Sequence, residues 1–172
     1  LSPGIERHAT QASIAPDGSS IVFTDSISGV IQLLRKLRDQ GEATPLAGTE
    51  RAVSPFFSPD GAWIGYLTTD GKLKKVPAAG GGSITLAENA NRVYAAATWL
   101  DDGTILFVDE ASALRRIPSD GGPGTIVLSD SSGMRRTMPI ITPLPGSRGV
   151  LLTTCPGNCS IASAISVFDF TA

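Results

Sequence analysis

The stretch Phe57–Tyr66, FSPDGAWIGY, places a Pro-Asp-Gly turn between two short apolar runs. An aspartate can hydrogen-bond to the backbone of its own turn, and glycine readily adopts the positive φ that many tight turns need. The flanking Phe, Trp, Ile and Tyr residues are typical of strands. This stretch therefore predicts two antiparallel strands joined by a tight hairpin.

The same pattern occurs four times along the chain. The other copies are IAPDGSSIVF at 14–23, WLDDGTILF at 99–107 and TPLPGSRGVLL at 142–152, and the four turn glycines are 43, 42 and 43 residues apart. A near-constant period of this length is typical of a repeat architecture. The residues expected to form the repeated turns are Asp17, Gly18, Asp60, Gly61, Asp102, Gly103, Pro145 and Gly146.

Each of the first three units continues with two basic residues between apolar ones and then closes with a short apolar segment. The basic quartets are Leu34–Leu37, Leu73–Val76 and Leu114–Ile117, with Val167–Phe170 expected as the fourth-unit counterpart, and the closing segments end at Leu46, Leu86 and Leu128. Neighbouring residues of a strand point to opposite faces. Half of the residues in Lys74-Lys75 and Arg115-Arg116 must therefore face a neighbouring blade or the channel. For the pairs we expect mainly a solvated edge, with a positive strip for an acidic peptide or linker as the alternative.

A unit of about 42 residues fits either two helices or four strands. Helical periodicity is confined to Ile31–Leu37, whereas short apolar runs between turns recur throughout. We therefore predict an all-β chain, a β-propeller built from four-stranded antiparallel blades, three complete and a fourth partial. The expected blades are about 10–48, 52–88, 94–130 and 136–172, within a single domain covering 1–172.

The blade count leaves two arrangements open. The segment before Ala12 could supply a missing strand and close a four-bladed ring, or the chain could be a fragment of a larger propeller, which we favour. Open blade faces promote association, so we expect that the chain could form a homo-oligomer through them. Phe57 and Trp99 are large enough to fill the wedge between blades, and we expect both to be buried.

Composition narrows the function classes. The chain has 172 residues, 14 Lys+Arg against 16 Asp+Glu, a net charge of −2 and 41% hydrophobic residues. This balance disfavours disorder and gives no electrostatic footprint for nucleic acid. No run approaches the roughly 18 apolar residues that cross a bilayer, and the first residues lack the pattern of a signal peptide. We expect neither nucleic-acid binding nor membrane insertion.

Catalytic constellations are scarce in the sequence. His8 is the single histidine, which disfavours a Ser-His-Asp triad or a multi-histidine metal site. The Gly80–Ser83 stretch lacks the residues of a phosphate-binding loop, and Gly121-Gly122 repeats it in the next unit, so both are interpreted as turns. The turn aspartates lack calcium-loop spacing. We predict no catalytic residue, no cofactor and no metal ligand.

The two cysteines, Cys155 and Cys159, enclose a Pro-Gly-Asn turn. A disulfide closing this turn is sterically plausible and would favour an oxidising compartment. Two free thiols are the equal alternative. A metal half-site is less favoured because no second cysteine pair completes it.

Residues Ala43–Gly81, and the continuing TWLDDGTILF, LRRIPSDGG and LPGSRGVLLTT, resemble TolB-like, WD-repeat-like β-propellers, especially those C-terminal to bacterial serine/threonine protein kinases. The resemblance implies an extracytoplasmic sensor or scaffold, bacterial, periplasmic or on the outer face of a membrane, that binds a protein or small ligand without catalysis. The alternatives are a propeller hydrolase or lactonase with a channel metal, or the gating propeller of a peptidase. Any kinase or peptidase activity would lie in a domain absent from this chain.

Overall fold

The computed structural model describes residues 11–93, 95–129, 136–156 and 164–170, and every structural statement below concerns these residues. They form an all-β chain of antiparallel sheets, three with four strands and one with three, which confirms the predicted fold class. A single turn of 3-10 helix, η1 (Pro145–Ser147), lies in the last hairpin. The segment Ile31–Leu37 belongs to a strand, as the repeat predicts.

The strands of each sheet follow one another in chain order. The first blade contains β1 (Ala12–Ile14), β2 (Ser20–Ile27), β3 (Val30–Leu37) and β4 (Thr44–Pro45). The second contains β5 (Ala52–Phe57), β6 (Trp63–Thr68), β7 (Leu73–Pro77) and β8 (Ile84–Ala87). The third contains β9 (Ala97–Trp99), β10 (Thr104–Val108), β11 (Leu114–Pro118) and β12 (Thr125–Leu128), and the fourth contains β13 (Arg136–Pro143), β14 (Gly149–Pro156) and β15 (Ala164–Asp169).

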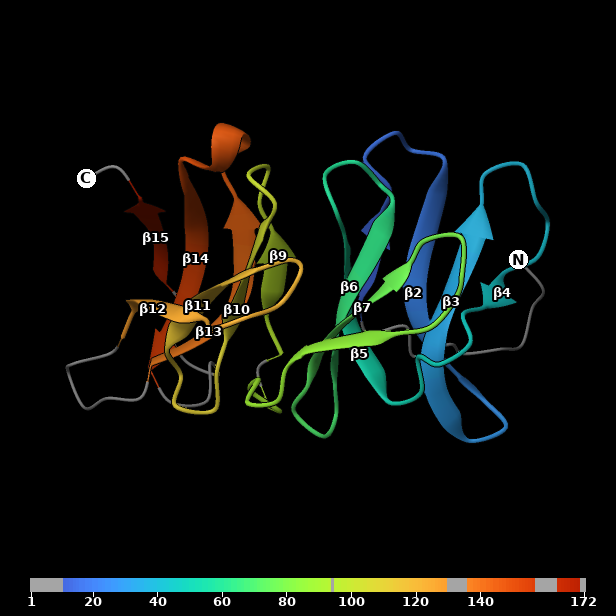
Figure 1. Cartoon of the computed structure of the whole chain (residues 1–172), viewed down its shortest axis with the longest axis horizontal. Helices are drawn as coiled ribbons and strands as arrows, with labels where there is room; N and C mark the ends of the chain where they lie inside the picture. Colours follow the sequence, from blue (N-terminus) through green and yellow to red (C-terminus); the bar gives the residue numbers. More distant parts are fainter. Residues whose placement is uncertain (1–10, 94, 130–135, 157–163, 171–172) are drawn as a thin grey trace.

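The four blades are arranged side by side. The first strands of consecutive blades pack against each other, β1 on β5, β5 on β9 and β9 on β13. Figure 1 shows the first blade at one end of the molecule and the fourth at the other. The suggestion that residues before Ala12 complete a ring falls on 1–10, outside the described residues.

The first hairpin of each blade contains the predicted turn. Its glycine has a left-handed backbone in all four copies, with φ of 69°, 70°, 81° and 71° at Gly18, Gly61, Gly103 and Gly146. In the first three copies the aspartate before this glycine accepts a hydrogen bond from the amide two residues further on, at 2.9 to 3.0 Å. The turn thus uses both properties expected from its sequence.

Backbone pairing corrects the alignment of the basic quartets by residue position. The residue after the third strand donates its amide to the loop of the first hairpin in every blade, through Arg38, Ala78, Ser119 and Phe170. This register makes Leu33–Lys36, rather than Leu34–Leu37, equivalent to Leu73–Val76. In the fourth blade the equivalent is Ile165–Phe168, not Val167–Phe170. Leu33 and Leu34 are adjacent leucines, so residue type alone fits two registers.

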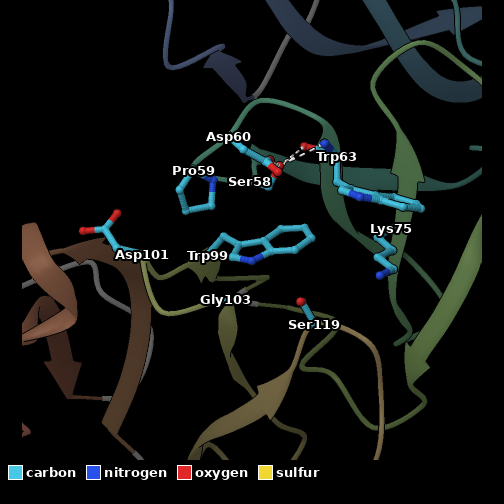
Figure 2. A pocket seen from close by; sticks show the side chains of 9 residues that line it. All are labelled: Ser58, Pro59, Asp60, Trp63, Lys75, Trp99, Asp101, Gly103 and Ser119. Carbon is cyan, nitrogen blue, oxygen red and sulfur yellow. Dashed lines mark hydrogen bonds between the residues drawn. The ribbon is translucent and has the colours of Figure 1, made fainter.

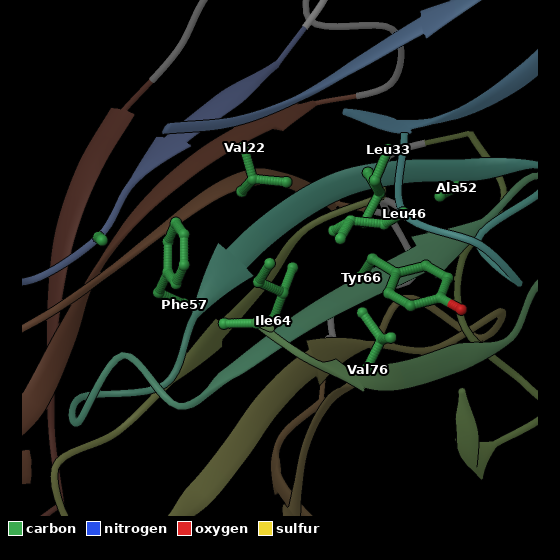
Figure 3. Close-up of a cluster of buried hydrophobic side chains, with 10 residues drawn as sticks. Val22, Leu33, Leu46, Ala52, Phe57, Ile64, Tyr66 and Val76 are labelled. Carbon is green, nitrogen blue, oxygen red and sulfur yellow. The ribbon is translucent and has the colours of Figure 1, made fainter. Parts of the chain in front are cut away.

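Hydrophobic clusters fill the junctions between consecutive blades. The cluster between the first and second blades contains Val22 and Leu33 from one side and Ile64 and Tyr66 from the other (Figure 3). The next two junctions contain clusters of the same kind. Phe57 and Trp99 are buried, with 8% and 7% exposure, as their size predicted. Burial of such faces is the main stabilising contribution of each junction.

Candidate functional site

One position of the repeat carries a basic side chain at three successive blade junctions. The register aligns Arg35 on β3, Lys75 on β7 and Arg116 on β11. Each of these side chains lies on the face that its blade turns toward the next blade. This position is thus the half of each basic pair that faces a neighbouring blade, and a solvated edge does not describe it. Lys75 illustrates this, because only 9% of it is exposed.

Protein groups bind the basic side chain in the first junction. The Nη1 atom of Arg35 donates a hydrogen bond of 2.6 Å to the carbonyl oxygen of Ala78 in the second blade. Its Nε atom donates one of 3.1 Å to the hydroxyl of Ser20. The guanidinium therefore spans the first junction and needs no external ligand.

The third junction follows the same rule. Arg116 donates a hydrogen bond of 2.9 Å from Nε to the Thr104 hydroxyl and forms an ion pair with Asp102. Its guanidinium carbon lies 5.0 Å from the ring centroid of Phe170, which occupies the position of Ala78. Protein groups again supply the partners of the cation, here a hydroxyl, a carboxylate and an aromatic ring.

The second junction differs. The Lys75 ammonium lies 4.4 Å from the centroid of the Trp63 ring, a cation–π distance. Among the described residues, no carboxylate lies within 4.0 Å of it, and no hydrogen bond joins it to a protein acceptor. Because no buried side-chain nitrogen of these residues lacks a hydrogen-bond partner, the ammonium is the solvent-accessible end of an otherwise buried side chain. Lys75 thus has a buried stem and a solvent-accessible ammonium, and the Trp63 ring is the protein partner of its charge.

The aspartate at the position of the Arg116 partner forms no ion pair with Lys75. Asp60 is equivalent to Asp102, the partner of Arg116, and its Oδ1 atom accepts hydrogen bonds of 2.5 Å from the Ser58 hydroxyl and 3.0 Å from the Ala62 amide, as Asp102 Oδ1 does from Thr104. The Ser58 hydroxyl bond and the amide of Ala62 lower the pKa of Asp60. Its carboxylate is therefore kept ionised and directed to the turn.

A cavity of about 270 Å³ lies beside the Lys75 ammonium. It is formed where the first hairpins of the second and third blades meet. Figure 2 shows the Trp63, Trp99 and Lys75 side chains around the pocket, with the hairpin of Asp60 next to them. Its lining residues are Ser58, Pro59, Asp60, Trp63, Lys75, Trp99, Asp101, Gly103 and Ser119. Both tryptophans of the chain lie here.

The two other acidic groups near the pocket also have partners. Asp101 accepts a hydrogen bond of 2.7 Å from the amide of Gly146 in the fourth blade. Burial acts to raise the pKa of Asp102, but the hydroxyl and amide of Thr104 and the charge of Arg116 outweigh it, so the net pKa is below its usual value. The pocket therefore combines two indole rings, one unpaired ammonium and acidic groups committed to structure.

The site residues predicted from the sequence lie in turns, at the end of a strand or outside the described residues. The turn residues hold the hairpins, as described above. Cys155 is buried at the end of β14, whereas Cys159 and His8 lie outside the described residues, so the disulfide stays a prediction. Within the described ranges, no group of three His, Cys, Asp or Glu side chains is placed to hold a metal ion. The same ranges contain no helix that is long and apolar enough to span a bilayer.

The outer faces of the first and fourth blades are apolar and exposed. On the first blade, Ile14 and Ile21 are 67% and 37% exposed, although their counterparts in the next two blades are buried. On the fourth blade, Ile165 is 77% exposed, although its counterparts Leu33 and Leu73 are fully buried. These faces thus resemble internal blade faces that lack a neighbour.

Four-stranded antiparallel sheets stacked by their faces define a β-propeller, and the described residues provide three such blades followed by one of three strands. Its fold is TolB-like, as solved structures show. TolB from Acinetobacter baumannii superimposes with a TM-score of 0.69 at 18% identity, over 92% of this chain and 40% of that one. A putative TolB from Agrobacterium tumefaciens gives 0.73 at 14% identity, over 92% and 60%.

The likeness extends to a nidogen/laminin complex, with a TM-score of 0.66 at 14% identity over 84% of this chain and 59% of that one. At such identities the likeness is one of fold. The chain spans about two fifths to three fifths of the length of these structures. No protein-family model matches the sequence, and no curated protein matches it significantly.

Proposed function

We propose that this chain is a non-catalytic β-propeller domain that binds a ligand or protein as a sensor or scaffold. The observation that carries the proposal is the pocket between the second and third blades. Arg35 and Arg116 have protein partners at the neighbouring junctions, but at this one a cavity of about 270 Å³ borders Lys75 and both tryptophans. Aromatic walls with a few oriented polar groups are typical of ligand sites.

Intrinsic tryptophan fluorescence can report ligand binding in the pocket and so test the proposal. Because Trp63 and Trp99 are the two tryptophans of the chain and both line the pocket, a ligand there should change the intrinsic tryptophan fluorescence. We expect a screen of small acids, amines, sugars and peptides to yield ligands that change the fluorescence in a saturable way and raise the melting temperature. A screen in which no compound does either would contradict the proposal.

We place the domain outside the cytoplasm, as a bacterial, kinase-associated sensor. The sequence resemblance to propellers attached to bacterial kinases supports this assignment. A disulfide between Cys155 and Cys159, one of the two states expected for these cysteines, would agree with it because such bonds persist in oxidising compartments. Fractionation of the source cells, with the chain followed by immunoblot, tests the compartment. The coding sequence around the gene tests the link to a kinase.

We also propose that the exposed outer faces bind each other in neighbouring copies, head to tail. At the internal junctions one basic residue meets a position without positive charge, as Arg35 meets Ala78. On the outer faces the roles are exchanged, because the fourth blade has Val167 at the basic position and the first blade has Arg38 at the position of Ala78. A junction between two copies would again contain one cation and extended apolar contact, including Ile165.

A further inference from the structure

We infer that the pocket recognises a carboxylate carried on an aromatic or other apolar group, with Lys75 as the residue that binds the carboxylate. This inference rests on the proposed binding function and names the chemical class of the ligand. Its starting point is the difference between three equivalent cations, of which only Lys75 lacks an oxygen partner among the described residues.

The charge of Lys75 argues for an anionic ligand. A ligand that fills the cavity removes water from the Lys75 ammonium, and this is costly unless a group of opposite charge or several hydrogen bonds compensate it. The Trp63 ring compensates part of this cost through its negative face, and an incoming carboxylate would supply the oxygen acceptors that Arg35 and Arg116 find in the protein. A carboxylate bound in a site of low exposure forms a charge-assisted hydrogen bond, which is stronger than a neutral one.

The acidic groups around the pocket restrict the charge of the ligand. Asp60 and Asp101 line the same cavity, and the lowered pKa of Asp60 keeps this carboxylate ionised at neutral pH. A polyanion such as a phosphate chain would meet these charges, whereas a single carboxylate seated on Lys75 adds only one negative charge. The site therefore favours a monocarboxylate.

The walls of the cavity determine the rest of the ligand. Trp63 and Trp99 contribute indole surface on two neighbouring blades, and Trp99 packs edge-to-face with Phe56, at 6.3 Å between ring centroids, which fixes its orientation. Ser119 adds a hydroxyl from the third blade. At about 270 Å³ the cavity is slightly below the roughly 300–1,000 Å³ of pockets for drug-sized ligands, so it suits one ring or side chain.

Tryptophan fluorescence titrations with phenylacetate and its uncharged analogue phenylacetamide test the inference on the intact chain. We expect phenylacetate to bind at least tenfold more tightly than phenylacetamide, and added salt to weaken only the acid. A third titration with N-acetyl-Ala-Phe separates two sources of the carboxylate. Tighter binding of the peptide than of phenylacetate identifies a peptide C-terminus, and the reverse identifies a small aromatic acid.

Lys75→Met should abolish the preference for the acid over the amide. Lys74→Met is the matched control, because its side chain lies on the opposite face of β7, and it should leave the preference unchanged. Equal affinities of the wild-type protein for acid and amide would overturn the inference and leave the binding function intact. Absence of binding by both would also overturn it, whereas the binding function fails only if the broader screen is negative. The wild-type comparison does not depend on whether Lys75→Met folds.

Discussion

The Arg35 guanidinium in the first blade donates a hydrogen bond of 2.6 Å to the carbonyl oxygen of Ala78 in the second. This bond links two sheets whose junction is filled mainly by apolar side chains. We expect Arg35→Met to lower the free energy of unfolding by about 1.5–3 kcal/mol, the range for hydrogen bonds to charged groups. Chemical denaturation measures the change. Arg148→Met, at an exposed turn arginine, is the control and should change stability by less than about 0.5 kcal/mol. Equal effects of both changes would contradict the role of Arg35.

The ion pair between Asp102 and Arg116 should make the free energy of unfolding depend on pH in the acidic range. The pKa of Asp102 is lowered in the folded protein, so its carboxylate stabilises the fold above the unfolded pKa of about 4. This contribution is lost as the pH falls through the lower folded pKa. Because about a third of the side chain is exposed, solvent screening limits the effect at neutral pH to about 1 kcal/mol.

Asp102→Asn should therefore be less stable than the wild-type protein at pH 7 and equally stable near pH 2. Denaturant titrations at several pH values measure both limits. A stability difference that is the same at pH 7 and pH 2 would show that Asp102 acts through the geometry of its turn and not through its charge.

Position 65 requires glycine because a side chain would clash with its neighbour, and not because of its backbone conformation. A Cβ atom at this position would lie 2.3 Å from the ring of Phe56, although the equivalent position in the next blade is Leu106. We expect Gly65→Ala to destabilise the protein by about 1–3 kcal/mol through overpacking. Gly82→Ala, where nothing lies within 4 Å of the added atom, is the matched control.

A second substitution should relieve this clash. In a double-mutant cycle, Phe56→Leu should reduce the cost of Gly65→Ala, because the smaller side chain leaves room for the methyl group. Additive effects of the two substitutions would contradict the proposed contact.

The sequence predicts the architecture well because each blade carries its own local signal. The turn around Gly61 needs only adjacent residues, and the burial of Phe57 and Trp99 follows from their size and place in the repeat. The pocket is different, because it depends on which face of β7 carries Lys75 and on what the third blade places opposite. Lys74 and Lys75 are identical in type, and only strand pairing decides which one is buried. Likewise, Leu33 and Leu34 offer two registers until β2 is paired with β3.

The predicted disulfide between Cys155 and Cys159 would close a very short loop. The entropy that such a cross-link removes from the unfolded chain corresponds to a stabilisation of about 2 kcal/mol for a loop of about five residues. We expect the purified protein to resist alkylation until it is both unfolded and reduced, and reduction to lower the melting temperature. Mass spectrometry with and without reductant measures the pairing. Alkylation of both cysteines in unfolded protein without reductant would contradict it.

The proposed contact between copies predicts an oligomer that depends on concentration. Ile165 lies on the outer face of the fourth blade at 77% exposure, so Ile165→Lys should leave the blade folded but place a charge in the contact. Sedimentation velocity over a hundredfold range of concentration should show association of the wild-type protein and a monomer for Ile165→Lys. Ile126→Lys, at an exposed position on β12 away from both outer faces, should associate as the wild-type protein does. A wild-type monomer at every concentration would show that the outer faces of this chain do not bind each other.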